Sequence, residues 1–306
     1  MYNEEQKLKY LRVVESDSSS AYISTMFNRF EKYETKCSKD IAYWDESSIY
    51  KTISAMSFDY GTIKQYLSIL SAYRAWACCK YSPQGYQKLN ADNVDLSGAI
   101  QSCLIRSPAA LKNELANVIE LDQGYYIVAA ACFAWLGIDM KTMPFLKDSS
   151  VNFIEKSIID EACNIEIHHI DKEIIDILQE YWTTTEAIRM HKTKCKAYPL
   201  YNGMFLHLMV GANSKKKIKP INYDSIRKEF GDLASRAMSP EGEQSRLSCP
   251  NLLRAGGLYR LYQLEKSGVD IFSGKSDELL LKTYSAPGKT YDIRSLYRQY
   301  KKAFNL

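Results

Sequence analysis

The stretch from residue 249 to residue 284 sets the tightest limits on how this chain can fold. It opens with Pro250, which suits the first turn of a helix, and leucines then recur at the spacing of an amphipathic helix. Gly268 predicts the end of that helix, because glycine favours the position just after a helical segment. A second helix, residues 276–283, is expected to carry Tyr284 at its end, before an Ala-Pro-Gly breaker. The chain must therefore pack two consecutive helices, with a tyrosine at the end of the second.

The length and composition of the chain indicate a soluble protein of two domains. Its 306 residues are enough for two separate cores. Hydrophobic residues make up 46% and charged residues 25%, the balance of a globular protein. No apolar run approaches the ~20 residues of a membrane helix, and the charged first residues do not resemble a signal peptide. We therefore expect a cytoplasmic protein that does not bind membranes.

The cysteines do not form a metal-site pattern. All eight are scattered along the chain without C-x-x-C spacing. We expect reduced and mostly buried thiols, no metal and no cofactor.

The clearest helix of the N-terminal half spans residues 62–79 and reads TIKQYLSILSAYRAWACC. Its apolar residues follow a helical stripe, while Lys64 and Arg74 lie off that stripe and are candidates for DNA contact. The same pattern is also that of a plain amphipathic helix on a core. Residues 81–100 carry Pro, Gly and Asn with little pattern and read as a linker region. We therefore expect a helical domain over residues 1–100.

The remaining residues, 101–306, are expected to form a second domain with a small β-sheet. Residues 125–135, YYIVAAACFAW, predict a buried helix, and the sequence Gly137-Ile138-Asp139 follows it. Two short β-rich runs, 158–159 and 165–167, predict a hairpin.

Basic residues gather in runs in this second half. The net charge of +4 is weak evidence by itself, and its distribution along the chain matters more. Each basic run is either a solvated surface loop or a contact to DNA. A helix capped by Asn222 or Asp224 is expected to carry two of the cations in its early turns. The candidate DNA-binding residues of this half are Lys192, Lys194, Lys215, Lys216, Lys217, Lys219, Arg227, Lys228, Arg246, Arg254 and Lys275.

The stretch from residue 249 to residue 284 resembles the second conserved box of the tyrosine recombinases, the phage integrase family. That box carries a His-x-x-Arg motif, then Gly-His, then a nucleophilic tyrosine nine residues after that histidine. Here Asn251-Leu252-Leu253-Arg254, Gly274-Lys275 and Tyr284 stand at those places. The arginine and the tyrosine are kept, and both histidines are replaced.

The resemblance covers about residues 20–290 and implies a mainly α fold with a small β-sheet. Its two domains would be a helical SAM-like core-binding domain, residues 1–100, and an integrase catalytic-like domain, residues 101–306. The family's first box is usually Gly-Leu-Arg, and its arginine falls on Asp139 here. The hairpin normally bears a lysine, whereas its turn in this chain reads Asp-Glu-Ala.

The resemblance also defines which chemistry is lost. In the family, two guanidinium groups neutralise the charged transition state at the phosphate, because they match phosphate geometry. Asp139 puts a carboxylate there instead, Asn251 cannot move protons, and Lys275 is only a point charge. We therefore expect no strand transfer and no enzyme. Tyr284 is expected to pack on the core, and Arg254 either binds phosphate or pairs internally, with Asp139 as a candidate partner.

With strand transfer lost, the resemblance implies a DNA-binding transcriptional repressor, and we expect it to maintain phage lysogeny. Its partners would be double-stranded operator DNA, at the nucleoid, and a protein antagonist or inducer; the sequence leaves the oligomeric state open. One alternative is an active, divergent integrase that cuts and rejoins DNA through Tyr284. Another is a helical interaction protein without affinity for DNA.

Overall fold

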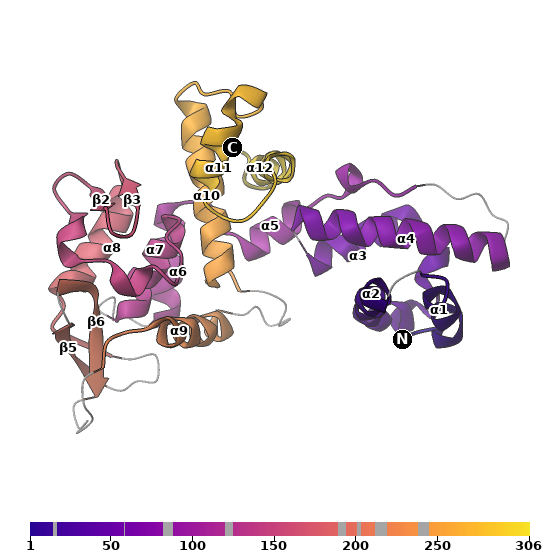
Figure 1. Cartoon of the computed structure of the whole chain (residues 1–306), viewed down its shortest axis with the longest axis horizontal. Coiled ribbons are helices and arrows are strands. Elements are labelled where there is room, and N and C mark those ends of the chain that lie inside the picture. Colours follow the sequence, from indigo (N-terminus) through magenta and orange to yellow (C-terminus); the bar gives the residue numbers. More distant parts are fainter. Residues whose placement is uncertain are drawn as a thin grey trace. The chain divides into compact units, whose positions relative to one another are not determined.

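The structure is a computed structural model that describes residues 1–14, 17–57, 59–81, 88–119, 125–188, 194–200, 203–211, 219–237 and 245–306 (Figure 1). The chain divides into two compact units. The first unit comprises residues 1–100 and 298–306, and the second unit comprises residues 101–297. Within the described ranges, every helix is too short or too polar to cross a bilayer.

The described part of the first unit is helical. Its elements are α1 (Glu4–Leu11), α2 (Asp17–Cys37), η1 (Ile41–Tyr43), α3 (Glu46–Met56), α4 (Tyr60–Tyr81), η2 (Ala91–Asn93) and the start of α5 (Ser97–Cys103). The Asp45 side chain begins α3 by accepting a hydrogen bond from the Ser48 N–H. Aromatic rings fill the core, where Phe27 of α2 and Tyr73 of α4 are fully buried with ring centroids 4.8 Å apart. The predicted helix at residues 62–79 is confirmed and forms most of α4.

The second unit combines helices with two small sheets. Its elements are the end of α5, α6 (Pro108–Ile119), α7 (Tyr126–Trp135), η3 (Met143–Phe145), η4 (Asp148–Ser150), β1 (Val151–Asn152), β2 (Ser157–Asp160), β3 (Ile165–Ile167), α8 (Lys172–Thr183), β4 (Glu186–Ile188), β5 (Lys194–Leu200), β6 (Met204–Gly211), α9 (Tyr223–Arg236), α10 (Cys249–Lys266), η6 (Gly274–Ser276), α11 (Asp277–Tyr284) and α12 (Thr290–Phe304). The last residues of α12 belong to the first unit.

Each sheet described by the structure has three antiparallel strands, in the orders β1-β2-β3 and β4-β5-β6. The first contains the predicted hairpin, with Ile158 opposite Ile167. The second corrects the prediction of a single small sheet. Its strand β5 contains Lys194 and Lys196, which are exposed, while Cys195 between them is buried. That alternation is the period of a strand with one buried face, although the lysines alone suggested a surface loop.

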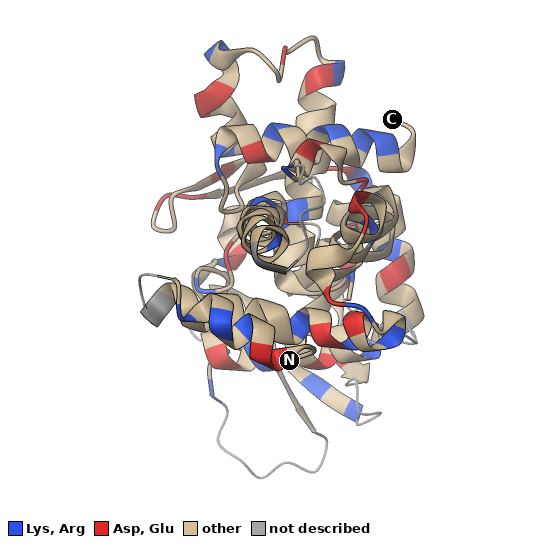
Figure 2. Ribbon diagram, turned by 90° about the vertical axis from the view of Figure 1, so that its right-hand side faces the viewer, with Lys and Arg blue, Asp and Glu red and all other residues tan. Residues whose placement is uncertain are grey.

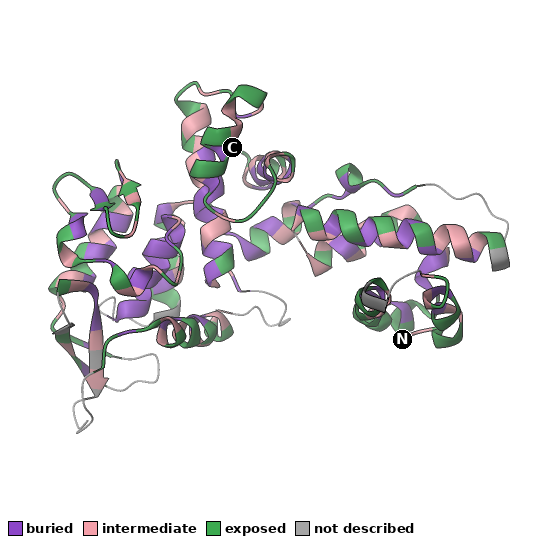
Figure 3. Ribbon diagram, viewed as in Figure 1, coloured by how far each residue is buried: buried purple, intermediate pink, exposed green. Residues whose placement is uncertain are grey.

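The helix α7 forms the centre of the second unit. Every residue from Tyr126 to Trp135 is buried, as Figure 3 shows along the whole of α7. The helix packs against α8, α9, α10 and β6, which leaves none of its sides to solvent. The predicted buried helix at residues 125–135 is therefore confirmed.

The helix α10 approaches two neighbours so closely that only glycine fits at the contacts. A Cβ atom on Gly256 would lie 1.8 Å from the carbonyl oxygen of Trp135, at the end of α7. A Cβ atom on Gly257 would lie 2.3 Å from the carbonyl oxygen of Tyr284, at the end of α11. Two adjacent glycines thus let the backbone of α10 touch the ends of two other helices. The predicted end of this helix is confirmed, since Gly268 adopts a positive φ of 96° just after it.

Replacing Gly256 with alanine is expected to destabilise the protein, because the Trp135 backbone must move to admit the methyl group. We expect a loss of about 3 kcal/mol in the free energy of unfolding, at the upper end for overpacking. Gly231→Ala in α9 is the matched control, since its Cβ would meet nothing within 4 Å. That control should gain about 0.5 kcal/mol from helix propensity. Urea unfolding curves measure both, and equal effects would contradict the close approach.

Candidate functional site

The tyrosine at the end of α11 is part of the core. Tyr284 is 2% exposed. Its Cδ2 atom would lie 2.9 Å from a Cβ atom on Gly257, and its Cε1 atom would lie 3.7 Å from one on Gly288. The ring therefore packs between the backbone of α10 and the segment after α11. This burial holds the phenol away from solvent, where a DNA phosphate would have to meet it.

Asp139 occupies an exposed turn between α7 and η3. Its Oδ1 atom accepts a hydrogen bond of 2.7 Å from the Lys141 N–H, and its carbonyl accepts from the Thr142 N–H. An Asp side chain stabilises such a turn by bonding to the backbone two residues on. Burial, and secondarily the charge of Asp139, raises the pKa of the Cys249 thiol to about 12. Asp139 therefore lies near enough to the start of α10 for its charge to act on Cys249.

The other positions of the second box lie on α10 and just before α11. Asn251 is 5% exposed, and its Nδ2 atom donates to the Ser245 carbonyl at 2.8 Å. Arg254 follows one turn later and is half-buried. Lys275 is exposed in η6, where its N–H donates to the Ser273 hydroxyl. Asn251 thus forms a hydrogen bond within its own unit, while Arg254 and Lys275 are partly or fully exposed to solvent.

A second arginine of α10, Arg260, joins the ends of two helices. Its Nη1 atom donates to the Trp135 carbonyl at 2.5 Å, and its Nε atom donates to the Thr283 carbonyl at 3.1 Å. These carbonyls lie in the last turns of α7 and α11, which lack partners within their helices and carry partial negative charge. Burial lowers the pKa of Arg260 to about 10, so the guanidinium stays charged at neutral pH. Its sequence position did not distinguish it from the exposed cations nearby.

Several predicted DNA-contact residues have internal partners. Arg74 donates to the carbonyls of Ala42 and Trp44 at 3.3 and 3.2 Å. Arg246 donates to the carbonyls of Gln101 and Ser102 and to the Glu114 carboxylate, the last at 2.6 Å. These guanidinium groups hold neighbouring segments of their own unit together.

Other predicted cations are exposed. Lys64 lies on the outside of α4, and Lys194 and Lys219 are exposed in the second unit. Asn222 caps α9 as expected, and both Arg227 and Lys228 are exposed in its first turns. Figure 2 shows Lys and Arg interspersed with Asp and Glu along the described helices. Predictions that lie outside the described residues concern Lys192, Lys215, Lys216 and Lys217.

The outer face of α2 is a surface that the sequence reasoning missed. We define it by six exposed residues at helical spacing, Thr25, Asn28, Arg29, Lys32, Thr35 and Lys36. Three are cations and three can form hydrogen bonds without charge. The carboxylate of Glu34 points into the core instead, where it is fully buried. One exposed acid of α2, Glu31, borders this face and pairs with the N-terminal amine of Met1 at 3.1 Å. The six residues themselves are of the types that contact phosphates and base edges. The sequence does contain a signal for this face, because its residues lie between the buried apolar positions of the same helix, Ile23, Met26, Phe27 and Phe30.

One comparison with known proteins bears on the first unit. Residues 1–80 match the family described as the MrpR N-terminal core-binding domain. The match spans α1 to α3 and most of α4, and it supports the predicted relation to tyrosine recombinases for this part of the chain. A search of curated protein sequences finds no significant match. Among the described residues, no His, Cys, Asp and Glu side chains are grouped to hold a metal ion.

Replacing Arg260 with methionine is expected to weaken the second unit, because two helix-end carbonyls lose a charged donor. We expect the free energy of unfolding to fall by about 3 kcal/mol. Lys266→Met, at the exposed end of the same helix, is the control and should change it by about 0.5 kcal/mol or less. Urea unfolding followed by circular dichroism measures both. A loss no larger than that of the control would show that Arg260 does not join the helices.

Proposed function

We propose that this chain is a transcriptional repressor that binds double-stranded DNA and does not cut it. The observation that carries the proposal is the burial of Tyr284 in a protein that retains a core-binding unit. Burial removes the nucleophile from the surface, while the core-binding unit keeps an exposed basic face. The proposed frame is a tyrosine recombinase that has lost its chemistry.

The electrostatics of the degenerate positions support the loss of strand transfer. Cleavage would place a doubly charged phosphate beside the positions of the two boxes. At the dielectric near a protein surface, a carboxylate about 4 Å from one unit of negative charge is repelled by about 4 kcal/mol. Asp139 would add such a repulsion where an arginine would add an attraction. Arg254 can still contact a phosphate, but one guanidinium group does not replace two.

The exposed residues support DNA binding in two ways, by general affinity and by sequence recognition. Lysine and arginine side chains neutralise phosphates and release counterions, which supplies affinity for any duplex. The outer face of α2 adds sequence recognition, because Asn28 can read adenine, and Lys32 and Lys36 can read guanine, in the major groove. A helix of 21 residues is about 30 Å long, more than the groove needs. The first turns of α9, with Arg227 and Lys228, are proposed as a second contact to the backbone.

A protein that binds DNA without cutting it acts by occupying its binding site on the DNA. We propose that it blocks transcription at an operator and so maintains phage lysogeny, as the resemblance to the lysogeny master repressor of SPbeta-type phages implies. Such a repressor works in the cytoplasm, at the nucleoid, and is released by a protein antagonist or inducer. In this proposal the surface cations provide affinity for DNA, and the buried tyrosine provides no catalysis.

A nicked suicide duplex tests the catalytic part of the proposal. We expect no covalent protein–DNA adduct from the wild-type chain, because Tyr284 is buried and the cations around a phosphate are incomplete. Asp139→Arg alone is expected to give none either, since the histidine and lysine positions remain changed. Denaturing gels detect adducts, and Tyr284→Phe is the control for attack by the phenol. An adduct that disappears in Tyr284→Phe would establish an active recombinase instead.

Gel shifts at two salt concentrations test the binding part. Wild-type affinity for duplexes from the DNA around its own gene should fall steeply with salt. Arg227→Ala and Lys216→Ala should weaken binding to all sequences and reduce the salt slope by about one each. Lys172→Ala is the matched control, since Lys172 is an exposed cation paired with Asp176 on α8. If both variants bound DNA as tightly as the wild type, the proposed contact surface would be wrong. If the wild type itself did not bind DNA, a protein-interaction role would be favoured.

A further inference from the structure

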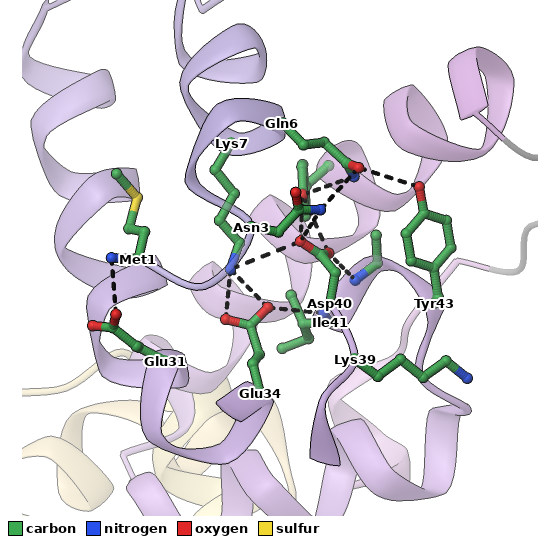
Figure 4. Close-up of polar contacts among 12 residues, drawn as sticks. Met1, Asn3, Gln6, Lys7, Glu31, Glu34, Lys39, Asp40, Ile41 and Tyr43 are labelled. Atoms are coloured by element: carbon green, nitrogen blue, oxygen red, sulfur yellow. Dashed lines mark hydrogen bonds and ion pairs between the residues drawn. The ribbon is translucent and has the colours of Figure 1, made fainter. Parts of the chain in front are cut away.

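A cluster of charged side chains lies inside the first unit (Figure 4). The Nζ atom of Lys7, on α1, donates to both oxygens of Glu34, on α2, at 2.7 and 2.5 Å. Both side chains are fully buried. The same Nζ atom lies 3.9 Å from the Oδ2 atom of Asp40, which is also buried. The cluster therefore holds one ammonium group and two carboxylates away from water.

The carboxylates connect four elements of the unit. Glu34 accepts a hydrogen bond from the Ile41 N–H in η1, at 2.8 Å. Asp40 accepts from the Tyr73 hydroxyl of α4 at 3.0 Å and from Asn3, before α1, at 3.1 Å. Burial, reinforced by Asp40, raises the pKa of Tyr73, so this hydroxyl keeps its proton and remains a donor. Through these bonds α1, α2, η1 and α4 share one network.

Such a cluster fixes the relative placement of the helices more than it stabilises the folded state. Moving charges out of water carries a large penalty that a buried ion pair only partly offsets, so apolar replacements are often as stable. Here burial raises the pKa of Glu34, while the bonds from Lys7 and Ile41 act in the opposite direction. What the bonds do provide is direction, because each is satisfied at only one relative placement of the helices.

We propose that this buried cluster sets the rotation of α2 against α4 and thereby positions the outer face of α2 for reading DNA sequence. Glu34 lies on the side of α2 opposite Lys32 and Lys36, so the cluster fixes the helix from behind. Arg29 adds a second tie to α4 from the outside, with its Nη1 atom 2.6 Å from the Tyr66 hydroxyl. This inference rests on the proposed function, since it concerns how the same surface gains specificity.

The rotation matters because base recognition tolerates little displacement. A side-chain tip on a helix lies about 6 Å from the axis, so a rotation of about 20° moves it by about 2 Å. That displacement exceeds the range of a hydrogen bond to a base edge. Contacts to phosphates survive it, because lysine and arginine side chains are long and flexible. The cluster should therefore control sequence discrimination and leave general affinity unchanged.

The double variant Lys7→Met/Glu34→Gln tests this separation. It removes one positive and one negative charge, so the net charge stays the same, and glutamine keeps an acceptor for the Ile41 N–H. Binding is measured on a duplex selected from a random pool by the wild type and on a scrambled duplex. We expect the ratio of the two affinities to fall about tenfold, the effect of losing one base pair of recognition. Affinity for the scrambled duplex should stay within about twofold of the wild type, because no exposed cation is lost.

The same helix provides a matched control. Lys9 and Glu5 form an exposed pair on α1, with Nζ and Oε1 atoms 2.7 Å apart. Lys9→Met/Glu5→Gln makes the same chemical change at the surface and should leave the affinity ratio unchanged.

A wild-type ratio in the folded Lys7→Met/Glu34→Gln variant would overturn the inference. If that variant does not fold, Tyr73→Phe replaces it, because this change removes one bond to Asp40 with little change in volume. An unchanged ratio in Tyr73→Phe would then overturn it. Failure of the proposed function has a different signature, since the wild type itself would then prefer no duplex.

Discussion

The contact of α10 with the ends of α7 and α11 is the constraint on which the second unit depends. Gly256 and Gly257 let the backbones meet, and Arg260 donates to a carbonyl at the end of each neighbouring helix. Backbone contact without side chains leaves little freedom for sliding, and the guanidinium group adds a charged donor to both helix ends. The three helices therefore form one block, in which the ring of Tyr284 is part of the packing.

Charged side chains are placed differently in the two units. In the first unit, Glu34 of α2 pairs with Lys7 in the core, while three cations of the same helix, Arg29, Lys32 and Lys36, stay exposed. In the second unit, two guanidinium groups, those of Arg246 and Arg260, contact carbonyls of their own unit. A net charge of +4 therefore says little about binding, because the arrangement decides which cations a polyanion can reach.

These two features fit the proposed function, in which the chain binds DNA without cutting it. A tyrosine used for packing and a carboxylate that stabilises a turn are both residues with structural value, so neither needs a catalytic role to be retained. The resemblance of residues 249–284 to an integrase box and the match of residues 1–80 to a core-binding domain come from separate parts of the chain. Both agree with the proposed binding of DNA.

The sequence by itself determined the long helices, because their apolar stripes and their breakers are local signals. Residues 62–79, 125–135 and 249–284 folded as those signals predicted, and the exposed turn at Asp139 follows from its own side chain. Only the tertiary structure decided which charged residues face inward. Local spacing treats Arg74, Arg260 and Lys7 as surface cations, yet each reaches a carbonyl or carboxylate from a distant part of the chain. A long side chain is buried only if folding brings such a partner within its reach, and no local pattern records that distance.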